Sequence, residues 1–462
     1  MVTATSSKVV SRKAPIRPGK VRTYGSALKY LFAQTDYEQM LRVRYNSDTF
    51  SLVRMKTLLK SLQDPHRQIQ SVHIAGTKGK GSTATMLAGM LQACKYKVGL
   101  FTSPHICDLR ERIRVNGEMI PRVQLTRLIA KLQPKIDKME DKPTFFEIMT
   151  ALAFCYFVDQ GVDIAVVEAG LGGRLDSTNV LKPTVCGLTS ISLDHMHQLG
   201  NTVAKIAEEK AGIFKKDVPI VSVPQSTEAK RVLRRLAKES KSRLMFTGEE
   251  IDFSYRVESS RQAGCHTRIC LTTDHSSFEH LPVPVFGEHQ AVNCGLALAL
   301  LDQLKLQGMN IDDELAKTGL ADVDLPGRME LIGQDPRVLV DGAHNAASIQ
   351  ALLRAMAQHI PYDSMVMIFG CAADKDIPGM MARISTGADK VVFTRTANNP
   401  RAARPEDLAA AYLEHCGREA QVTESLFDAL QIARNAAGRE DIICICGSFY
   451  LVGEAKLMLE SH

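Results

Sequence analysis

The chain has 462 residues, of which 45% are hydrophobic and 23% are charged, and these values are typical of a soluble globular protein with two or three domains. The formal net charge is +6, but six basic residues and no acidic residue lie in the first 26 positions, so the remainder is nominally neutral. This distribution argues against a basic body surface for nucleic acid. The six residues are Lys8, Arg12, Lys13, Arg17, Lys20 and Arg22.

Residues 1–25 have a composition that allows two interpretations. A segment that contains Ser, Pro and Arg but no acid is similar to a transit peptide, and it is also typical of a disordered extension, which we favour. The sequence has no stretch of 18 apolar residues, which argues against a membrane protein. The 11 cysteines include no CxxC pair, so we expect reduced thiols in a cytoplasmic protein, without a disulfide framework or a zinc site.

From about residue 70, short apolar runs alternate with helix-like segments. The expected strands are 71–75, 97–102, 163–168, 184–191 and 218–223, and the expected helices are 82–94, 123–138, 147–159 and 203–212. This alternation indicates a parallel sheet that is covered on both faces. Thr144 and Glu147 form a capping-box pattern before an apolar helix, where a structural role and a place at a ligand pocket both remain open.

The stretch GTKGKGS at residues 76–82 lies between the first expected strand and the first expected helix. It departs from the usual phosphate-loop spacing because Gly81 separates Lys80 from Ser82. Its physical elements are nevertheless those of a phosphate site: glycines that expose backbone N–H groups, the positive end of a helix, and a lysine charge. We therefore predict a nucleotide-phosphate loop, the alternative being a glycine-rich turn with solvated lysines.

The loops that follow the next three strands carry Ser103, Glu168 and His195. In an open parallel sheet the carboxyl ends of the strands form one crevice, so we expect these side chains to approach the phosphate loop. Two oxygen ligands and an imidazole suit a divalent cation that bridges ATP phosphates. Taken singly, each residue has an ordinary structural explanation as a turn serine, a strand-end glutamate or a core histidine.

Residues 247–285 mix polar and β-branched residues, which predicts an antiparallel insertion, and a helix is expected over 288–304. The prolines and glycines of 323–336 then break the periodicity and mark the expected domain boundary. Strand-like runs resume beyond it and predict a second, smaller α/β domain. These runs are 337–345, 364–371, 390–394 and 441–448.

Seven ordered motifs resemble those of the folylpolyglutamate synthase and dihydrofolate synthase family of Mur-ligase-type ATP-dependent amide ligases. The motifs are GTKGKGS, SPH, EAGLGGRLDSTN, LDH, EKAGI, LPGRME and DGAHN. The resemblance implies an α/β fold with a P-loop-type parallel-sheet ATPase domain and a smaller Rossmann-like C-terminal domain. The implied boundaries are a tail at 1–25, an ATP-binding domain at 26–322, a hinge at 323–327 and a C-terminal ligase domain at 328–462.

The resemblance also implies roles for individual positions. The implied ATP-binding residues are Gly76, Thr77, Lys78, Gly79, Lys80, Gly81, Ser82, Asn293, Arg328 and Asp341. The implied metal ligands are Ser103, Glu168, His195 and Lys210. The implied catalytic residues are Lys80, His344 and Lys210, and the implied folate-side residues are Asp176 and Arg174.

Two lysines in these motifs have more than one interpretation. Lys210 matches a lysine that is carbamylated in many relatives, a change that requires a neutral amine and makes it an anion able to bind a second metal ion. The alternative is a helix lysine paired with Glu208 or Glu209. Lys78 occupies a position where many bacterial members have asparagine, and lysine there is similar to eukaryotic-type enzymes. Its side chain either adds phosphate affinity or points outward.

The implied reaction activates a folate-side carboxylate with ATP to give an acyl phosphate, which the α-amine of L-glutamate then attacks. The resemblance implies Mg²⁺, K⁺ as a further cation, ATP as co-substrate, and folate or dihydropteroate as acceptor, in a monomer without nucleic-acid or membrane partners. We expect a bifunctional enzyme, with restriction to one acceptor as the narrower form. The alternatives are a Mur-type ligase of cell-wall precursors, whose phosphate loop resembles GTNGKT instead, and a non-catalytic nucleotide-binding relative.

Overall fold

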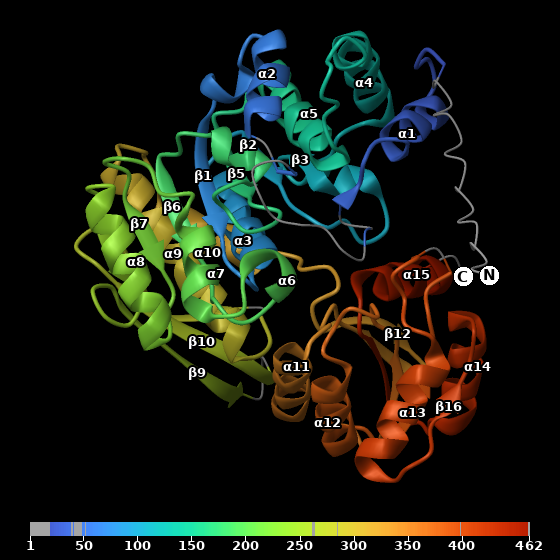
Figure 1. The fold of residues 1–462 in the computed structure, drawn as a ribbon. Coiled ribbons are helices and arrows are strands. Elements are labelled where there is room, and N and C mark those ends of the chain that lie inside the picture. Colours follow the sequence, from blue (N-terminus) through green and yellow to red (C-terminus); the bar gives the residue numbers. More distant parts are fainter. Residues whose placement is uncertain are drawn as a thin grey trace, which may run out of the picture.

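The computed structural model describes residues 19–37, 40, 49–50, 52–260, 264–283, 285–397 and 399–460. The chain forms two α/β units side by side, each built on its own sheet, with a three-stranded sheet attached to the first (Figure 1). The expectation for residues 1–18 lies outside the described residues. Within the described part, Val21 is already buried and the first helix, α1 (Tyr24–Phe32), begins three residues later.

The first sheet has eight strands in the order β4-β3-β2-β5-β1-β6-β7-β8. Six of its strands pair in parallel, and β3 and β4 form an antiparallel edge. The five strands predicted in this region are confirmed, with ends shifted by up to three residues. The bounds are β1 (Gln70–Ala75), β2 (Val98–Phe101), β3 (Ile113–Val115), β4 (Glu118–Met119), β5 (Ile164–Glu168), β6 (Val185–Leu188), β7 (Ile220–Ser222) and β8 (Leu244–Phe246).

Helices cover both faces of this sheet, as predicted from its near-continuous apolar strands. One face packs against α3 (Lys80–Ala93), α9 (Glu288–Leu306) and α10 (Asp313–Ala321). The other face packs against α1, α2 (Leu52–Ser61), α4 (Arg122–Ile136), α5 (Phe145–Gln160), α7 (Val203–Ala211) and α8 (Thr227–Glu239).

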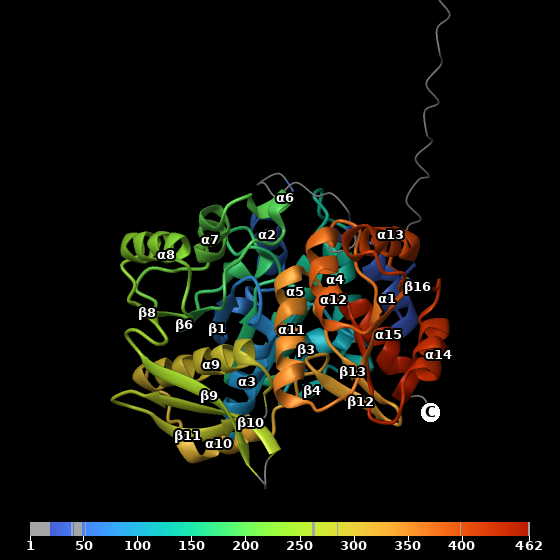
Figure 2. The same cartoon turned by 90° about the horizontal axis from the view of Figure 1, so that it is seen from below.

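The predicted antiparallel insertion is a three-stranded sheet in the order β11-β10-β9. Its strands are β9 (Asp252–Ser260), β10 (Gly264–Thr272) and β11 (Ser277–Val283). Its apolar face joins the core around α9. Figure 2 shows this sheet, α9 and α10 on one side of the molecule and the C-terminal unit on the other.

The second sheet has the order β12-β13-β17-β14-β15-β16, with an antiparallel edge at β12. Its strands are β12 (Glu330–Gln334), β13 (Arg337–Val340), β14 (Met365–Phe369), β15 (Lys390–Phe393), β16 (Gln421–Val422) and β17 (Ile442–Cys446). One face packs against α11 (Ala346–His359), α12 (Ile377–Gly387) and α13 (Pro405–Cys416), and the other against α14 (Leu426–Ala436) and α15 (Phe449–Glu460). The predicted second α/β unit is thereby confirmed.

The structure contains no disulfide among the described residues, which include all eleven cysteines. Among the described residues, no helix is both long enough and apolar enough to cross a membrane.

Candidate active site

A cavity of about 760 Å³ lies between the two α/β units. The loops that follow β1, β2, β5 and β6 line it from the first unit, and the loops that follow β13, β14 and β17 line it from the second. The carboxyl ends of both parallel sheets therefore face the same space. This is the place where open α/β sheets bind ligands, and it confirms the crevice expected from the sequence.

The glycine-lysine stretch forms the turn from β1 into α3. Gly79 has φ +87° and stands at the N-cap of α3, while Lys80 begins the helix. The backbone N–H of Thr77 donates to the carbonyl of Ser190 at 2.8 Å, which fixes the loop against the chain beyond β6. The first turn of α3 and the Lys80 ammonium border the cavity, an arrangement suited to phosphate because first-turn N–H groups have no partner within a helix.

Two glycines of this loop are required by close contacts. A Cβ atom at Gly76 would lie 1.8 Å from Oγ1 of Thr189, and one at Gly79 would lie 2.1 Å from Oδ1 of Asn293. Both positions also have positive φ values. The loop therefore packs tightly against β6 on one side and against α9 on the other.

Glu168 ends β5 beside the phosphate loop. Its Oε1 lies 3.7 Å from Nζ of Lys80, and its Oε2 accepts the backbone N–H of Ser103 at 2.9 Å. Burial raises the pKa of this carboxyl, while Lys80 and the Ser103 N–H oppose the rise. Ser103, Glu168 and His195 all line the cavity, so the structure brings three of the four predicted metal ligands to one site, whereas Lys210 does not line it.

The donor set matches a cation that shares its ligands with phosphate. In the described part of the chain no group of three His, Cys, Asp or Glu side chains is arranged to hold a metal ion. Mg²⁺ normally takes one or two protein carboxylates and completes its shell with water and substrate phosphates. One buried carboxylate, a serine and a histidine beside a phosphate loop fit that mode.

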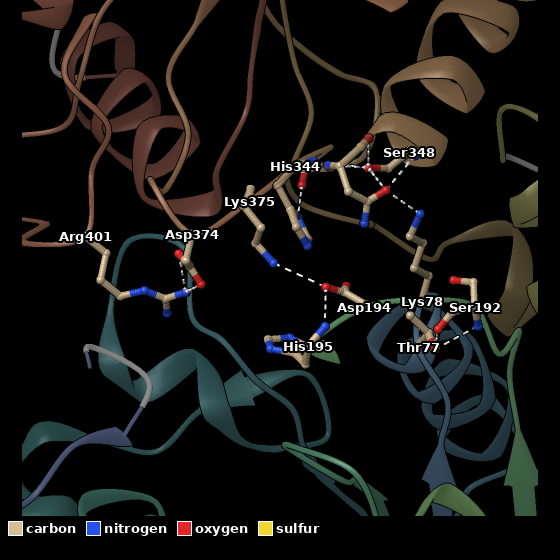
Figure 3. A network of polar contacts seen from close by, with 12 residues as sticks. Thr77, Lys78, Ser192, Asp194, His195, His344, Ser348, Asp374, Lys375 and Arg401 are labelled. Carbon is tan, nitrogen blue, oxygen red and sulfur yellow. Dashed lines mark hydrogen bonds and ion pairs between the residues drawn. The ribbon is translucent and has the colours of Figure 1, made fainter. Parts of the chain in front are cut away.

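His195 lines the cavity and stands at the N-cap of the short helix α6 (Met196–Leu199), with φ +48°. Its backbone N–H donates to Oδ1 of Asp194 at 2.9 Å, and the same oxygen accepts Nζ of Lys375 at 3.3 Å (Figure 3). Burial acts to raise the pKa of Asp194, but the His195 and Lys375 charges hold it well below its ordinary value. Asp194 is therefore an anion that ties Lys375 of the second unit to the first.

Lys210 lies behind the phosphate loop and does not line the cavity. It is 4% exposed, and its Nζ donates to the carbonyl of Gly76 at 2.7 Å. Burial, and then the Lys80 charge, lowers the pKa of Lys210 to about 7. A substantial share of this amine is thus neutral near neutral pH. The structure pairs neither Glu208 nor Glu209 with it, because these residues bind Arg235 and Arg174.

Asn293 of α9, Arg328 between α10 and β12, and Asp341 and His344 of the second unit all line the cavity. The Arg328 guanidinium lies 4.4 Å from the centroid of the Phe449 ring. Asp341 accepts the backbone N–H groups of Met329 at 3.0 Å and Ala343 at 2.8 Å, which hold the chain after β13 in place. The predicted nucleotide contacts from both units therefore converge.

His344 points into the cleft between the units (Figure 3). Its Nδ1 lies 2.8 Å from the carbonyl of Gly342, so this nitrogen carries the proton and donates. Burial, and then the Lys375 charge, lowers the pKa of His344 to about 4. The imidazole is neutral at physiological pH, and its Nε2 is left as a proton acceptor.

The two predicted folate-side residues lie in different places. Asp176 is buried at the cavity wall and accepts the backbone N–H groups of Leu171 at 2.8 Å and Thr178 at 3.0 Å. Arg174 does not line the cavity, and its exposed guanidinium pairs with Glu209 at 2.8 Å. The structure thus brings Asp176 to the cavity and leaves Arg174 outside it.

Part of the cavity, which we call its aromatic arm, is lined by Tyr37, Phe50, Phe146, Arg54 and Glu147, so Glu147 has the place at a ligand pocket that the sequence left open. Nε of Arg54 lies 2.7 Å from Oε2 of Glu147, and the two side chains are 6% and 8% exposed. The predicted capping box is present, since Glu147 also accepts the Thr144 N–H at 2.7 Å. The capping residue therefore serves both helix and cavity wall. The capping-box pattern of Thr144 and Glu147 was the sequence signal for this arm.

Lys78 does not point outward but lines the cavity. Its Nζ donates to Oδ1 of Asn345, at the start of α11, at 2.6 Å (Figure 3). Together with the Lys375–Asp194 bond, this contact joins the two units across the cavity. Sequence reasoning missed Lys375 and Asp194, although Lys375 follows β14 in the loop position that carries functional residues in parallel sheets.

Comparison with known proteins agrees with the sequence motifs. The Mur ligase middle domain matches residues 74–301, and the Mur ligase glutamate ligase domain matches residues 327–449. A dihydrofolate synthase/folylpolyglutamate synthase of Bacillus subtilis is 35% identical over 88% of this chain and 95% of that protein. A dihydrofolate synthetase of Saccharomyces cerevisiae is 30% identical over 89% of this chain and 98% of its own length.

The fold is shared with solved structures as well. A Mycobacterium tuberculosis folylpolyglutamate synthase, solved with ADP and AMPPCP, superposes with a TM-score of 0.82 at 32% identity. The similarity covers 89% of this chain and 95% of that chain. On this evidence from sequence, fold and cavity, the chain belongs to the dihydrofolate synthase/folylpolyglutamate synthase family of Mur ligases.

Proposed function

We propose that this protein is an ATP-dependent ligase that joins L-glutamate to folates, and that it accepts both dihydropteroate and tetrahydrofolate. The observation that carries the proposal is the single cavity in which a phosphate loop of one unit faces the Asp341–His344 loop of the other. A ligase that makes an acyl phosphate needs such an enclosed junction, because water hydrolyses the intermediate. The relatives with this architecture include proteins named for each activity and for both.

The ATP phosphates would lie on the loop from Gly76 to Ser82, with Lys80 as the charged contact. Arg328 and Asn293 would contact the rest of the nucleotide from the hinge side. Mg²⁺ would be held by Ser103, Glu168 and His195, and it would neutralise the charge on the phosphates. K⁺ remains a prediction from the family resemblance.

The flat ring system of a pteridine fits the aromatic arm. Tyr37, Phe50 and Phe146 line the cavity with aromatic rings, and Arg54, Glu147 and Asp176 line it with polar groups. We place the acceptor in this arm, with its carboxylate toward the phosphate loop. Breadth of acceptor choice would then depend on the shape of this arm and not on the chemistry at the loop.

The reaction is the one implied by the motifs. A carboxylate oxygen of the acceptor attacks the γ-phosphorus of ATP and releases ADP, and the glutamate nitrogen then attacks the acyl carbon and displaces phosphate. The attacking amine has to lose a proton, and neutral His344 has a free acceptor nitrogen at the cleft. We assign this proton transfer to His344. For Lys210, the lowered pKa supports the carbamylation predicted above, since the reaction with CO₂ needs a neutral amine.

The proposal is tested by phosphate release from purified protein with ATP, Mg²⁺ and L-glutamate, in parallel with dihydropteroate and with tetrahydrofolate. Products are identified by mass. We expect release with both acceptors, each gaining one glutamate. Release with one acceptor would reduce the proposal to that activity, and no release from folded protein with either would refute it.

A further inference from the structure

A direct bond between the phosphate loop and the C-terminal unit is made by Lys78. Its Nζ donates to Oδ1 of Asn345 at 2.6 Å, between residues 267 positions apart. The two residues belong to loops that follow β1 and β13, one in each sheet. Because the bond crosses the cavity, its length depends on how the two units are placed relative to each other.

The acceptor atom is held firmly in the second unit. Oδ1 of Asn345 is the N-cap oxygen of α11 and accepts the Ser348 backbone N–H at 3.0 Å, and the backbone N–H of Asn345 donates to Oγ of Ser348 at 3.1 Å. α11 has 14 residues and also contacts α9 and β10 of the first unit. Lys78 therefore holds a fixed point at the start of a helix. A small rotation of the second unit would break the bond.

The charge at this contact is compensated only in part by Asp194. The N-terminal end of a helix carries partial positive charge, so an ammonium group at the N-cap of α11 is repelled. Burial lowers the pKa of Lys78 to about 8, while Asp194 opposes this effect and Lys375 adds to it. Triphosphate in the neighbouring loop would supply negative charge and remove the repulsion. Closure through Lys78 is thereby linked to nucleotide binding.

We propose that Lys78 is a positioning residue that clamps the C-terminal unit over the phosphate loop when ATP is bound. The clamp would set the distance between the phosphates and His344, which immediately precedes Asn345 in the chain. This inference rests on the proposed function for its consequence in catalysis. The clamp itself affects nucleotide affinity and the compactness of the protein, and both can be measured without turnover.

The test is a double-mutant cycle on AMPPCP affinity, measured by titration calorimetry with Mg²⁺ in excess. The variants are Lys78→Met, Asn345→Asp and the pair. Asp keeps the N-cap of α11 and adds a charge opposite Lys78, so the helix start is preserved. A charged hydrogen bond of this kind is worth about tenfold in an equilibrium constant. We expect Lys78→Met to weaken AMPPCP binding about tenfold in the wild-type background. The same substitution should cause a larger loss of affinity in the Asn345→Asp background.

Small-angle scattering of the same samples measures closure directly, and Lys78→Met should expand the AMPPCP-bound protein. Lys78→Met should also raise the KM for glutamate in the ligase assay. Lys78→Arg keeps the charge and the donor, so its compaction and its KM for glutamate should be close to those of the wild type. Lys216→Met, which removes a lysine whose side chain is 73% exposed, is the matched control and should change neither. Additive losses in the cycle, or unchanged scattering by Lys78→Met, would overturn the clamp. A non-additive cycle would still support the clamp if the ligase assay gave no product. In that case only the proposed function would be contradicted.

Discussion

Replacing Gly79 with alanine tests the phosphate loop most sharply. Gly79 has φ +87°, and holding a residue with a Cβ in this region costs about 1–2 kcal/mol. The added Cβ would also lie 2.1 Å from Oδ1 of Asn293, roughly 1.5 Å inside an ordinary contact. Asn293 is 5% exposed and its Nδ2 donates to Gln290 at 3.0 Å, so moving it away costs about one more hydrogen bond, about 1 kcal/mol.

We therefore expect backbone strain and displacement of Asn293 together to lower the free energy of unfolding of Gly79→Ala by about 2–3 kcal/mol. The variant should also bind AMPPCP at least tenfold more weakly. Gly248→Ala is the matched control, since Gly248 has φ +82° but its Cβ would meet only an ordinary contact at 3.9 Å. Chemical denaturation should show a loss of about 1–2 kcal/mol from backbone strain in both variants, and about 1 kcal/mol more in Gly79→Ala. Only Gly79→Ala should lose AMPPCP affinity by calorimetry. Affinity equal to that of the wild type would refute the reasoning that this turn is shaped for phosphate.

Three further predictions concern buried charges. Arg54→Met leaves the Glu147 carboxylate buried without its partner and should lower the free energy of unfolding by about 3–5 kcal/mol, whereas the double variant with Glu147→Gln should recover part of the loss in the same denaturation experiment. Lys210 has a pKa of about 7 when folded and near its ordinary value when unfolded, so the unfolded chain binds more protons between these values and stability rises with pH. In metal-free, CO₂-free buffer, the wild type should gain about 2 kcal/mol more than Lys210→Met between about pH 7.5 and about pH 9.5, and parallel curves would contradict the burial of this amine. Asp341→Ala removes the acceptor of two backbone N–H groups, so we expect the free energy of unfolding to fall by about 2 kcal/mol. We also expect kcat/KM for ATP to fall at least tenfold. Retained activity would show that this loop needs no anchor.

The sequence by itself determined the layered fold and the place of the site. Near-continuous apolar strands such as β1 and β5 can only be buried on both faces, which requires a parallel sheet with helices on each side. Residues that follow such strands meet at one edge, so Ser103, Glu168 and His195 were predicted to share the cavity with the phosphate loop, and they do. These inferences depend on local pattern and chain order alone.

Only the tertiary structure decided what depends on burial and on contacts between distant segments. The lowered pKa of Lys210 arises from its position behind the phosphate loop, and the outward pairing of Arg174 with Glu209 removes it from the cavity. The Lys78–Asn345 bond depends on the relative placement of two separately folded units. Local sequence patterns do not encode such placement, because it is set by the summed packing of the whole interface.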